Sequence, residues 1–383
     1  MANPNSTPSG TLIDPAGANP WISSGTGQDV VELGNNLIYK VSEGDYRMLF
    51  EGFDTGAPTP DRTFLATSTS LLGPWIKYGG QNTPIAVLDR GPSGAFDDVI
   101  ATVGNLLFDG TTYHYYYQGT RSPTAYDIGH ATAPAGSNWH TWTKDVNNPI
   151  IVRGASGQFD SAHTLPGGVC VKDGIYYMFL QGHNGTIYQI GLATAMSPYG
   201  PWVKYKNNPV FSPGGGLAGV ATLFDPLTKS FFCWYSTATD IKFAVSSDGI
   251  NWTGLGTVFP SKCSGCLANG LIGDAITVQR IDGLYVIAGH CYTAFSNGNR
   301  NAGYMTIPDK VFNPGILTQW KFNFATGVET VYASSSEEAN RALLERGVIA
   351  SVSGVSSPVV QGFPLTTTSH KTFGALTSIT VPS

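Results

Sequence analysis

Acidic side chains stand at matching places just before five apolar strands that the sequence predicts. They are Asp29, Asp97, Asp160, Asp225 and Asp274, with Asp98 and His163 close by. A single Asp at such a place often caps a turn or accepts backbone N–H groups. Five at equivalent places favour convergence of several on one axis. Two carboxyl groups beside a glycosidic oxygen, one of them protonated, are the chemistry of glycoside hydrolysis.

A second set of polar side chains follows the aromatic strands, usually beside glycine. These side chains are the right type to hydrogen-bond sugar hydroxyls, and Arg121 suits a carboxylate such as that of a uronic or sialic acid. The set comprises Glu51, Gln118, Arg121, Gln181, His183 and His290. We predict sugar contacts for its first five members and for Asp98, Asp160 and Asp274.

A repeated phrase predicts the elements that would position these groups. A turn followed by alternating aromatic residues recurs at 43–52, 109–119, 173–182 and 282–290, with a degenerate copy at 227–237. Asp-Gly before alternating aromatics is typical of a β-hairpin. Each copy leads to a second phrase with a small, polar turn, and in four copies a Trp follows: Trp75, Trp142, Trp202 and Trp252. Five copies of a four-stranded unit predict an all-β, five-bladed β-propeller, with each Trp packed between blades.

Two extensions flank the predicted propeller of residues 23–312. Residues 1–22 are rich in Pro, Ser, Thr and Asn, which predicts an extended arm. Residues 313–383 predict a β-rich extension with one short helix at 337–346, where Ser335-Ser-Glu-Glu338 forms a capping box. Both extensions are suited to docking on other protein subunits.

Composition narrows the class of protein. Only 12% of the 383 residues are charged and the formal net charge is −5, so nucleic acid is not an expected partner. No apolar stretch reaches the roughly 18 residues of a membrane helix, and the first residues lack the pattern of a signal peptide. A virion or extracellular location is therefore expected, with the cytoplasm as the alternative.

The five cysteines form no dense disulfide framework. Cys170 and Cys233 lie inside apolar runs and are expected in the core. Cys263 and Cys266 could form a local disulfide, stay as free thiols or, less typically, hold a metal with the His290-Cys291 pair.

Phe96-Asp97-Asp98 and Phe159-Asp160, each followed by an apolar strand and an Asp-Gly-x-Tyr-like hairpin, resemble the five-bladed glycoside hydrolases of families 43, 32 and 117. The resemblance covers about residues 25–310. It implies that Asp29 is the general base or nucleophile. It also implies that Asp97, or Asp98, sets the pKa and the orientation of the catalytic groups. The third blade has no Glu for the general acid; family 117 implies His163 instead, although a turn hydrogen bond would explain that residue equally. Family 43 also implies His290 beside an axial Ca²⁺ or other cation, and no cofactor is otherwise required.

Three functions are compatible with these observations. The first is a glycan-recognising propeller in a larger assembly, such as a phage fibre, tail or capsid-surface protein that binds cell-surface polysaccharide. The second is a glycoside hydrolase of the family 43 or 117 type. The third is a purely structural propeller.

Overall fold

The computed structural model describes residues 11–12, 33–52, 61–121, 125–213, 217–226, 228–237, 240–260, 276–292, 300–308, 318–324, 327–333 and 376–380. All regular elements within these residues are β-strands, and none of them is a helix able to cross a membrane. The chain divides into two compact units, Pro4–Asp309 and Lys310–Ser383, the latter taken together with Met1–Asn3. The boundaries predicted at residues 22 and 312 stay predictions, and the helix predicted at 337–346 lies outside the described residues.

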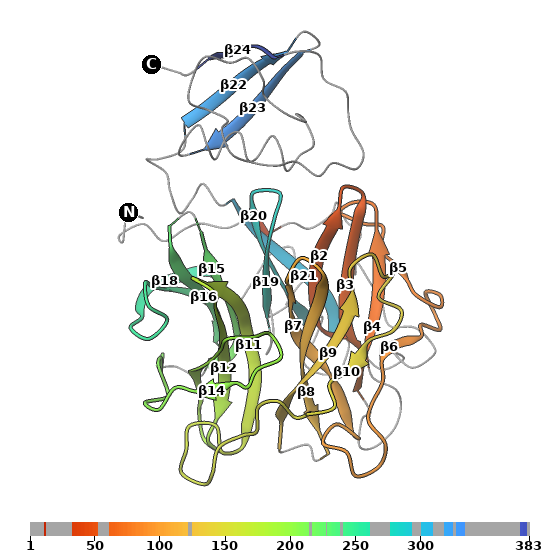
Figure 1. Ribbon diagram of the computed structural model, residues 1–383, viewed down its shortest axis with the longest axis vertical. Coiled ribbons are helices and arrows are strands. Elements are labelled where there is room, and N and C mark those ends of the chain that lie inside the picture. The colour runs from red at the N-terminus through yellow and green to blue at the C-terminus, as the bar shows by residue number, and fades with distance from the viewer. Residues whose placement is uncertain are drawn as a thin grey trace. The chain divides into compact units, whose positions relative to one another are not determined.

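Successive antiparallel strands build the larger unit (Figure 1). The first group is β2 (Leu33–Ser42), β3 (Asp45–Gly52), β4 (Asp61–Ser68), β5 (Ile76–Lys77) and β6 (Ala86–Leu88). The second is β7 (Ile100–Phe108), β8 (Thr112–Thr120), β9 (Asp127–Pro134) and β10 (Thr143–Lys144). The third is β11 (His163–Lys172), β12 (Ile175–His183), β13 (Tyr188–Ala195) and β14 (Val203–Lys204). The fourth is β15 (Leu217–Asp225), β16 (Ser230–Thr237), β17 (Asp240–Ser246) and β18 (Thr253–Pro260), and the fifth is β19 (Thr277–Ile281), β20 (Leu284–Tyr292) and β21 (Arg300–Pro308).

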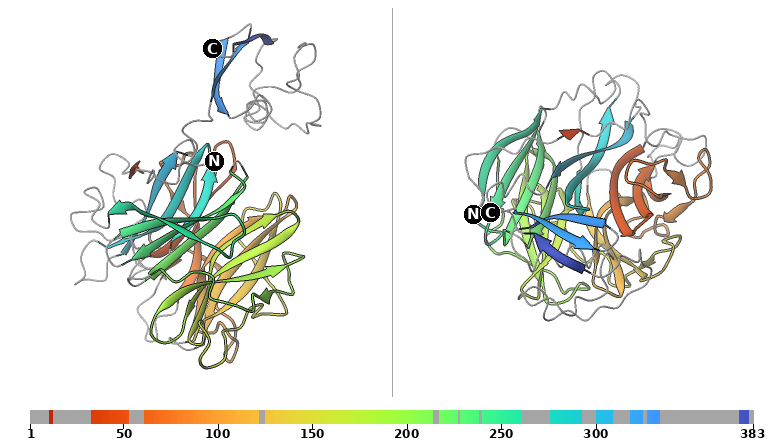
Figure 2. Two further views of the ribbon diagram at one scale, coloured as in Figure 1. Left: turned by 90° about the vertical axis from the view of Figure 1, so that its left-hand side faces the viewer. Right: turned by 90° about the horizontal axis from the view of Figure 1, so that it is seen from above.

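The first strands of these groups form a closed cycle. β2 contacts β7, β7 contacts β11, β11 contacts β15, β15 contacts β19, and β19 returns to β2. The right-hand view of Figure 2 shows the sheets of this unit standing around a common centre. β1 (Thr11–Leu12) pairs antiparallel with β21, so a strand from the start of the chain becomes the fourth strand of the last group. This arrangement confirms the predicted all-β propeller, and we call each group a blade.

The hydrophobic core is divided among the interfaces between neighbouring blades. Trp142 packs in a cluster with Leu49 of the first blade, and Trp202 packs with Tyr116 of the second. Trp75 and Trp252 fill the corresponding places at the interfaces of blades 5 and 1 and of blades 3 and 4. The predicted packing role of the four tryptophans is thus confirmed, as is the burial of Cys170 and Cys233.

Strand direction brings chemically useful residues to one end of the propeller. Because each blade is an antiparallel meander, its first and third strands begin where its second strand ends. Parallel pairing of Asp61 with Ile100, and of Tyr126 with His163, links the start of one blade's third strand to the start of the next blade's first strand. We call this the entry end of the propeller.

The predicted entry position of Asp225 is wrong. Asp225 is the last residue of β15, and its carboxylate accepts hydrogen bonds from the backbone N–H and the hydroxyl of Thr228 and from the hydroxyl of Tyr285. It therefore holds the β15–β16 turn at the opposite end of the blade, the structural role that a short Asp side chain fills well.

In the smaller unit, β22 (Thr318–Phe324) lies between β23 (Gly327–Ala333) and β24 (Leu376–Thr380) in a three-stranded antiparallel sheet. The described strands of this unit agree with the predicted β-rich character of the C-terminal extension.

Candidate functional site

The loop that enters the second blade is repeated before the third blade. Residues 90–97 and 153–160 both read Arg-Gly-x-Ser-Gly-x-Phe-Asp. Each loop is closed by a hydrogen bond from the glycine N–H, Gly91 or Gly154, to the backbone oxygen of the final Asp. The two copies therefore position Asp97 and Asp160 in the same way.

Both aspartates are buried, and each forms an ion pair with a partly exposed lysine. Asp97 is 2% exposed, and its Oδ2 accepts hydrogen bonds from the Tyr117 hydroxyl at 2.9 Å and from Nζ of Lys144 at 2.5 Å. Asp160 is 1% exposed and makes the equivalent contact with Lys204. Lys144 lies on β10 and Lys204 on β14, the last strands of the second and third blades. Each ion pair therefore connects the loop that enters a blade to the last strand of the same blade. These are the contacts of structural ion pairs, and the catalytic role of Asp97 and the sugar contact of Asp160 stay predictions.

Two histidines and two tyrosines gather at the entry end of the third blade. Nδ1 of His163 lies 3.1 Å from the hydroxyl of Tyr188, and the rings of His163 and His183 are 5.1 Å apart. The ring of Tyr126 packs edge-on against His163 at 4.8 Å. Burial, together with the charges of His183 and Arg153, lowers the pKa of His163 to about 4. His163 is therefore neutral near pH 7, and the general-acid role predicted for it would need a pH near 4.

Two carboxylates of the first blade lie close to this histidine–tyrosine cluster. Glu51 at the end of β3 and Asp61 at the start of β4 are each 4% exposed. Glu51 is directly opposite Thr63 in the antiparallel register, so Asp61 is its diagonal neighbour on the same face. Such neighbouring positions are about 7–8 Å apart, and their Cβ atoms are somewhat closer. Burial, followed by the charges of Asp61 and Glu51, raises the pKa of Tyr126 to about 12, so both carboxylates act electrostatically on its hydroxyl.

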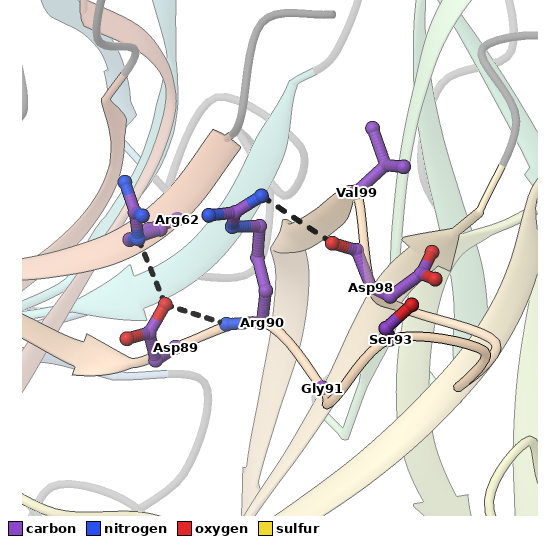
Figure 3. A pocket seen from close by; sticks show the side chains of 7 residues that line it. All are labelled: Arg62, Asp89, Arg90, Gly91, Ser93, Asp98 and Val99. Atoms are coloured by element: carbon purple, nitrogen blue, oxygen red, sulfur yellow. Dashed lines mark hydrogen bonds and ion pairs between the residues drawn. The ribbon is translucent and has the colours of Figure 1, made fainter.

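A pocket of about 390 Å³ lies at the entry end between the first and second blades (Figure 3). It is lined by Arg62, Asp89, Arg90, Gly91, Ser93, Asp98 and Val99. The Asp98 carboxylate, one of the predicted sugar contacts, accepts a hydrogen bond from the N–H of Gly94 through Oδ2. Its buried Oδ1 has no hydrogen-bond partner among the described residues, so it keeps the capacity to accept one more hydrogen bond.

The remaining predicted residues divide into two groups. Gln118 ends up on β8 and Gln181 on β12, both near the entry end, while Arg121 is exposed just after β8. Asp29, Asp274 and the side chain of His290 lie outside the described residues, as do Cys263 and Cys266. Within the part of the chain that is described, no three His, Cys, Asp or Glu side chains are grouped as metal ligands.

Three residues of the site were absent from the sequence prediction: Asp61, Tyr126 and Tyr188. Each stands five residues before the Ala of a repeated Ala-Thr pair, Ala66, Ala131 or Ala193. Aligning the third strands on that pair would have found them, because equivalent positions of repeated blades face the same end of the fold.

Solved structures with a similar fold were found, whereas no protein-family model and no curated protein matches the chain. One, reported with glycoside hydrolase family 130 enzymes that target β-1,2 mannosidic linkages in Candida mannan, has a TM-score of 0.60 at 16% identity over 79% of this chain and 94% of the other. A glycosyl hydrolase from Bacteroides ovatus has a TM-score of 0.57 at 16% identity, and the match covers 79% of this chain and 96% of that protein. A family 117 glycoside hydrolase from the marine bacterium Zobellia galactanivorans has a TM-score of 0.54 at 15% identity, and the match covers 79% of this chain and 89% of that protein. At these identities the likeness shows the fold: the chain folds as the propellers of glycoside hydrolases do.

Proposed function

We propose that this propeller binds a polysaccharide at its entry end and hydrolyses a glycosidic bond there, with Glu51 and Asp61 as the carboxyl pair. The observation that carries the proposal is the diagonal placement of these two buried carboxyl groups beside the histidine–tyrosine cluster. Diagonal positions on one face of a sheet are about 7–8 Å apart, with the Cβ atoms somewhat closer. That spacing allows two carboxyl groups to reach the separation of roughly 5–9.5 Å that glycosidases use.

The two carboxyl groups can take different roles. Two carboxyls in one buried site do not readily ionise together, so one tends to keep a proton. The protonated group can donate to the leaving oxygen while the ionised group activates water or attacks the sugar. Neutral His163 and the hydroxyls of Tyr126 and Tyr188 are suited to hydrogen-bond the sugar and to orient it.

The test is release of reducing ends from a panel of plant, algal and bacterial polysaccharides. Glu51→Gln and Asp61→Asn should each lower the rate per folded molecule at least about 100-fold. Urea unfolding of each variant gives the folded fraction, so that a loss of stability is separated from a loss of activity. Asp173→Asn is the matched control, because Asp173 is an exposed carboxylate in a turn at the opposite end with a φ of 52°, which Asn also adopts. Full activity in both site variants would refute the assignment of the carboxyl pair.

A second candidate is glycan binding without cleavage, the function that the sequence favoured first. The observation in its favour is the pocket beside Asp98, where Asp98 Oδ1 and Arg90 Nε have no partner within the described residues and the carboxyl pair is not involved. Retention on immobilised polysaccharide with no reducing ends released would select this function. The placement in a phage fibre, tail or capsid, and docking on other subunits through the two extensions, find no support in the comparisons and stay proposals.

A further inference from the structure

The pocket between the first two blades contains Arg90, whose guanidinium is bonded to a backbone oxygen rather than to a carboxylate. Arg90 donates from Nη1 to the backbone oxygen of Asp98 at 3.3 Å, and its buried Nε has no hydrogen-bond partner in the described part of the chain. Within the described residues, no carboxylate forms an ion pair with Arg90. Asp89 is instead bonded to Nε of Arg62 at 2.7 Å. Arg62 and Arg90 therefore bring two guanidinium groups to one pocket, as Figure 3 shows.

The second copy of the entry loop shows what is unusual about Arg90. Its counterpart Arg153 pairs with Asp127, Nη1 lying 3.2 Å from Oδ2. Asp127 stands four residues before Ala131 in the third strand of its blade, and the equivalent position before Ala66 is Arg62. The second junction places the Asp127 carboxylate beside the loop arginine. The first junction places Arg62 there instead, and Arg62 is bonded to Asp89. The loop arginine therefore has an ion-pair partner in one copy and, within the described residues, none in the other.

The opposite side of the pocket can form hydrogen bonds with hydroxyl groups of a ligand. Figure 3 shows the Asp98 carboxylate turned away from the two arginines, toward Ser93. Its buried Oδ1 is an acceptor without a partner among the residues that the structure describes, and the hydroxyl of Ser93 can donate or accept. The volume of about 390 Å³ lies in the usual range of ligand pockets. The pocket thus combines a cationic side with a hydrogen-bonding side.

We propose that this pocket is a subsite for an acidic sugar, in which Arg90 binds a carboxylate or sulfate group and Asp98 accepts a hydrogen bond from a ring hydroxyl. Guanidinium groups form strong, charge-assisted hydrogen bonds with such oxyanions, and burial of part of the guanidinium strengthens them. The proposal rests on carbohydrate binding at the entry end, as the proposed function does, and it names the substrate class: a uronic-acid-containing or sulfated polysaccharide.

The test compares sugars that differ only at carbon 6. The full chain is titrated with galacturonate, galactose 6-sulfate and galactose, and separately with glucuronate and glucose, and dissociation constants are followed by ligand-observed NMR. At least one acidic sugar should bind about tenfold more tightly than its neutral counterpart, a difference of about 1.4 kcal/mol. Its affinity should fall when ionic strength rises from about 20 mM to about 500 mM. The acid that binds more tightly, carboxylate or sulfate, identifies the natural group.

Three variants locate the effect. Arg90→Gln should reduce binding of the acidic sugar to the level of the neutral one, whereas Arg153→Gln, in the neutralised copy of the loop, should leave it unchanged. Arg121→Gln tests the exposed arginine that the sequence suggested for a carboxylate. Equal binding of acidic and neutral sugars, or loss of acid binding in Arg121→Gln but not in Arg90→Gln, overturns the proposal. Because the readout needs no cleavage, an inactive chain that still prefers acidic sugars would refute the hydrolase and retain the subsite.

Discussion

The buried pair of Asp97 and Lys144 offers the sharpest test of which aspartates support the fold and which do chemistry. Lys144→Met removes the cation but keeps the apolar stem, so the Asp97 carboxylate, 2% exposed, retains the Tyr117 hydroxyl as a partner and loses its countercharge. Breaking a buried pair by removing one partner costs roughly 3–5 kcal/mol. The lysine side chain is 27% exposed, which points to the lower end, about 3 kcal/mol.

The converse change is expected to be milder. Asp97→Asn keeps an acceptor for Tyr117, and the partly exposed lysine can reach water, so we expect a loss of about 1.5 kcal/mol. The double variant contains neither the buried carboxylate nor the lysine charge. Its free energy of unfolding should fall by about 2 kcal/mol rather than by the sum of the two single losses, about 4.5 kcal/mol. The difference is a coupling energy of about 2.5 kcal/mol between the two residues.

The measurement is equilibrium unfolding in urea, followed by tryptophan fluorescence, for the wild type, both single variants and the double variant. Lys204→Met should repeat the result in the second copy of the loop, where Asp160 is 1% exposed. Glu43→Gln, which removes an exposed pair with Lys40, should cost less than about 1 kcal/mol. If Asp97→Asn unfolds like the wild type yet abolishes hydrolysis, the structural reasoning fails and the catalytic role predicted from the sequence holds.

Three further outcomes follow from the packing and protonation of the entry end. The pKa of His163 is about 4 in the folded chain, against 6.5 for an unperturbed histidine, so the unfolded state takes up the proton first as pH falls. The contribution of neutral His163 to the free energy of unfolding is therefore present above about pH 6.5 and is lost toward pH 4. Between pH 7 and 5 the free energy of unfolding of the wild type should fall by about 1 kcal/mol more than that of His163→Gln in urea unfolding, a value that allows for the partial exposure of the ring. Trp142→Ala should cost about 3–5 kcal/mol while sugar binding to the folded fraction persists, because Trp142 packs between blades. Gly129→Ala would place Cβ 2.4 Å from the Tyr117 ring and 2.6 Å from the Phe96 ring, a loss of about 1–3 kcal/mol by thermal or urea unfolding.

The fold was predictable because its signals are local. Each aromatic hairpin combines alternating side chains with a turn that needs positive φ, as at Asp173 with φ 52° and Gly174 with φ 77°. The repeated phrase at 173–182 corresponds in the structure to a turn followed by β12, and the phrase at 109–119 corresponds to a turn followed by β8. Periodicity and turn chemistry need no knowledge of distant residues, so they are readable in one chain.

The site was less predictable because its contacts are long-range. Nothing near Asp97 in the sequence reveals that Lys144, 47 residues later, neutralises its carboxylate. Glu51 was predicted only as a sugar contact, since its diagonal neighbour Asp61 is ten residues later in the sequence and belongs to another strand. An aspartate before an apolar strand looks the same in sequence whether it faces a ligand or a lysine; the register of neighbouring strands decides which.

Differences between the repeated blades mark the functional surface more clearly than their similarities. Positions that hold the blade together are the same in both copies of the loop: glycine, phenylalanine, aspartate and the lysine that pairs with it. Positions that face the entry end differ. Asp98 is replaced by Ser161, Ile100 by His163, and Asp61 by Tyr126. Packing imposes the same requirement on every blade, whereas a ligand at the centre is asymmetric and contacts each blade differently. The positions where equivalent residues diverge in charge are therefore those where substrate contacts are expected, and the change from Asp127 to Arg62 beside the repeated arginine is such a position.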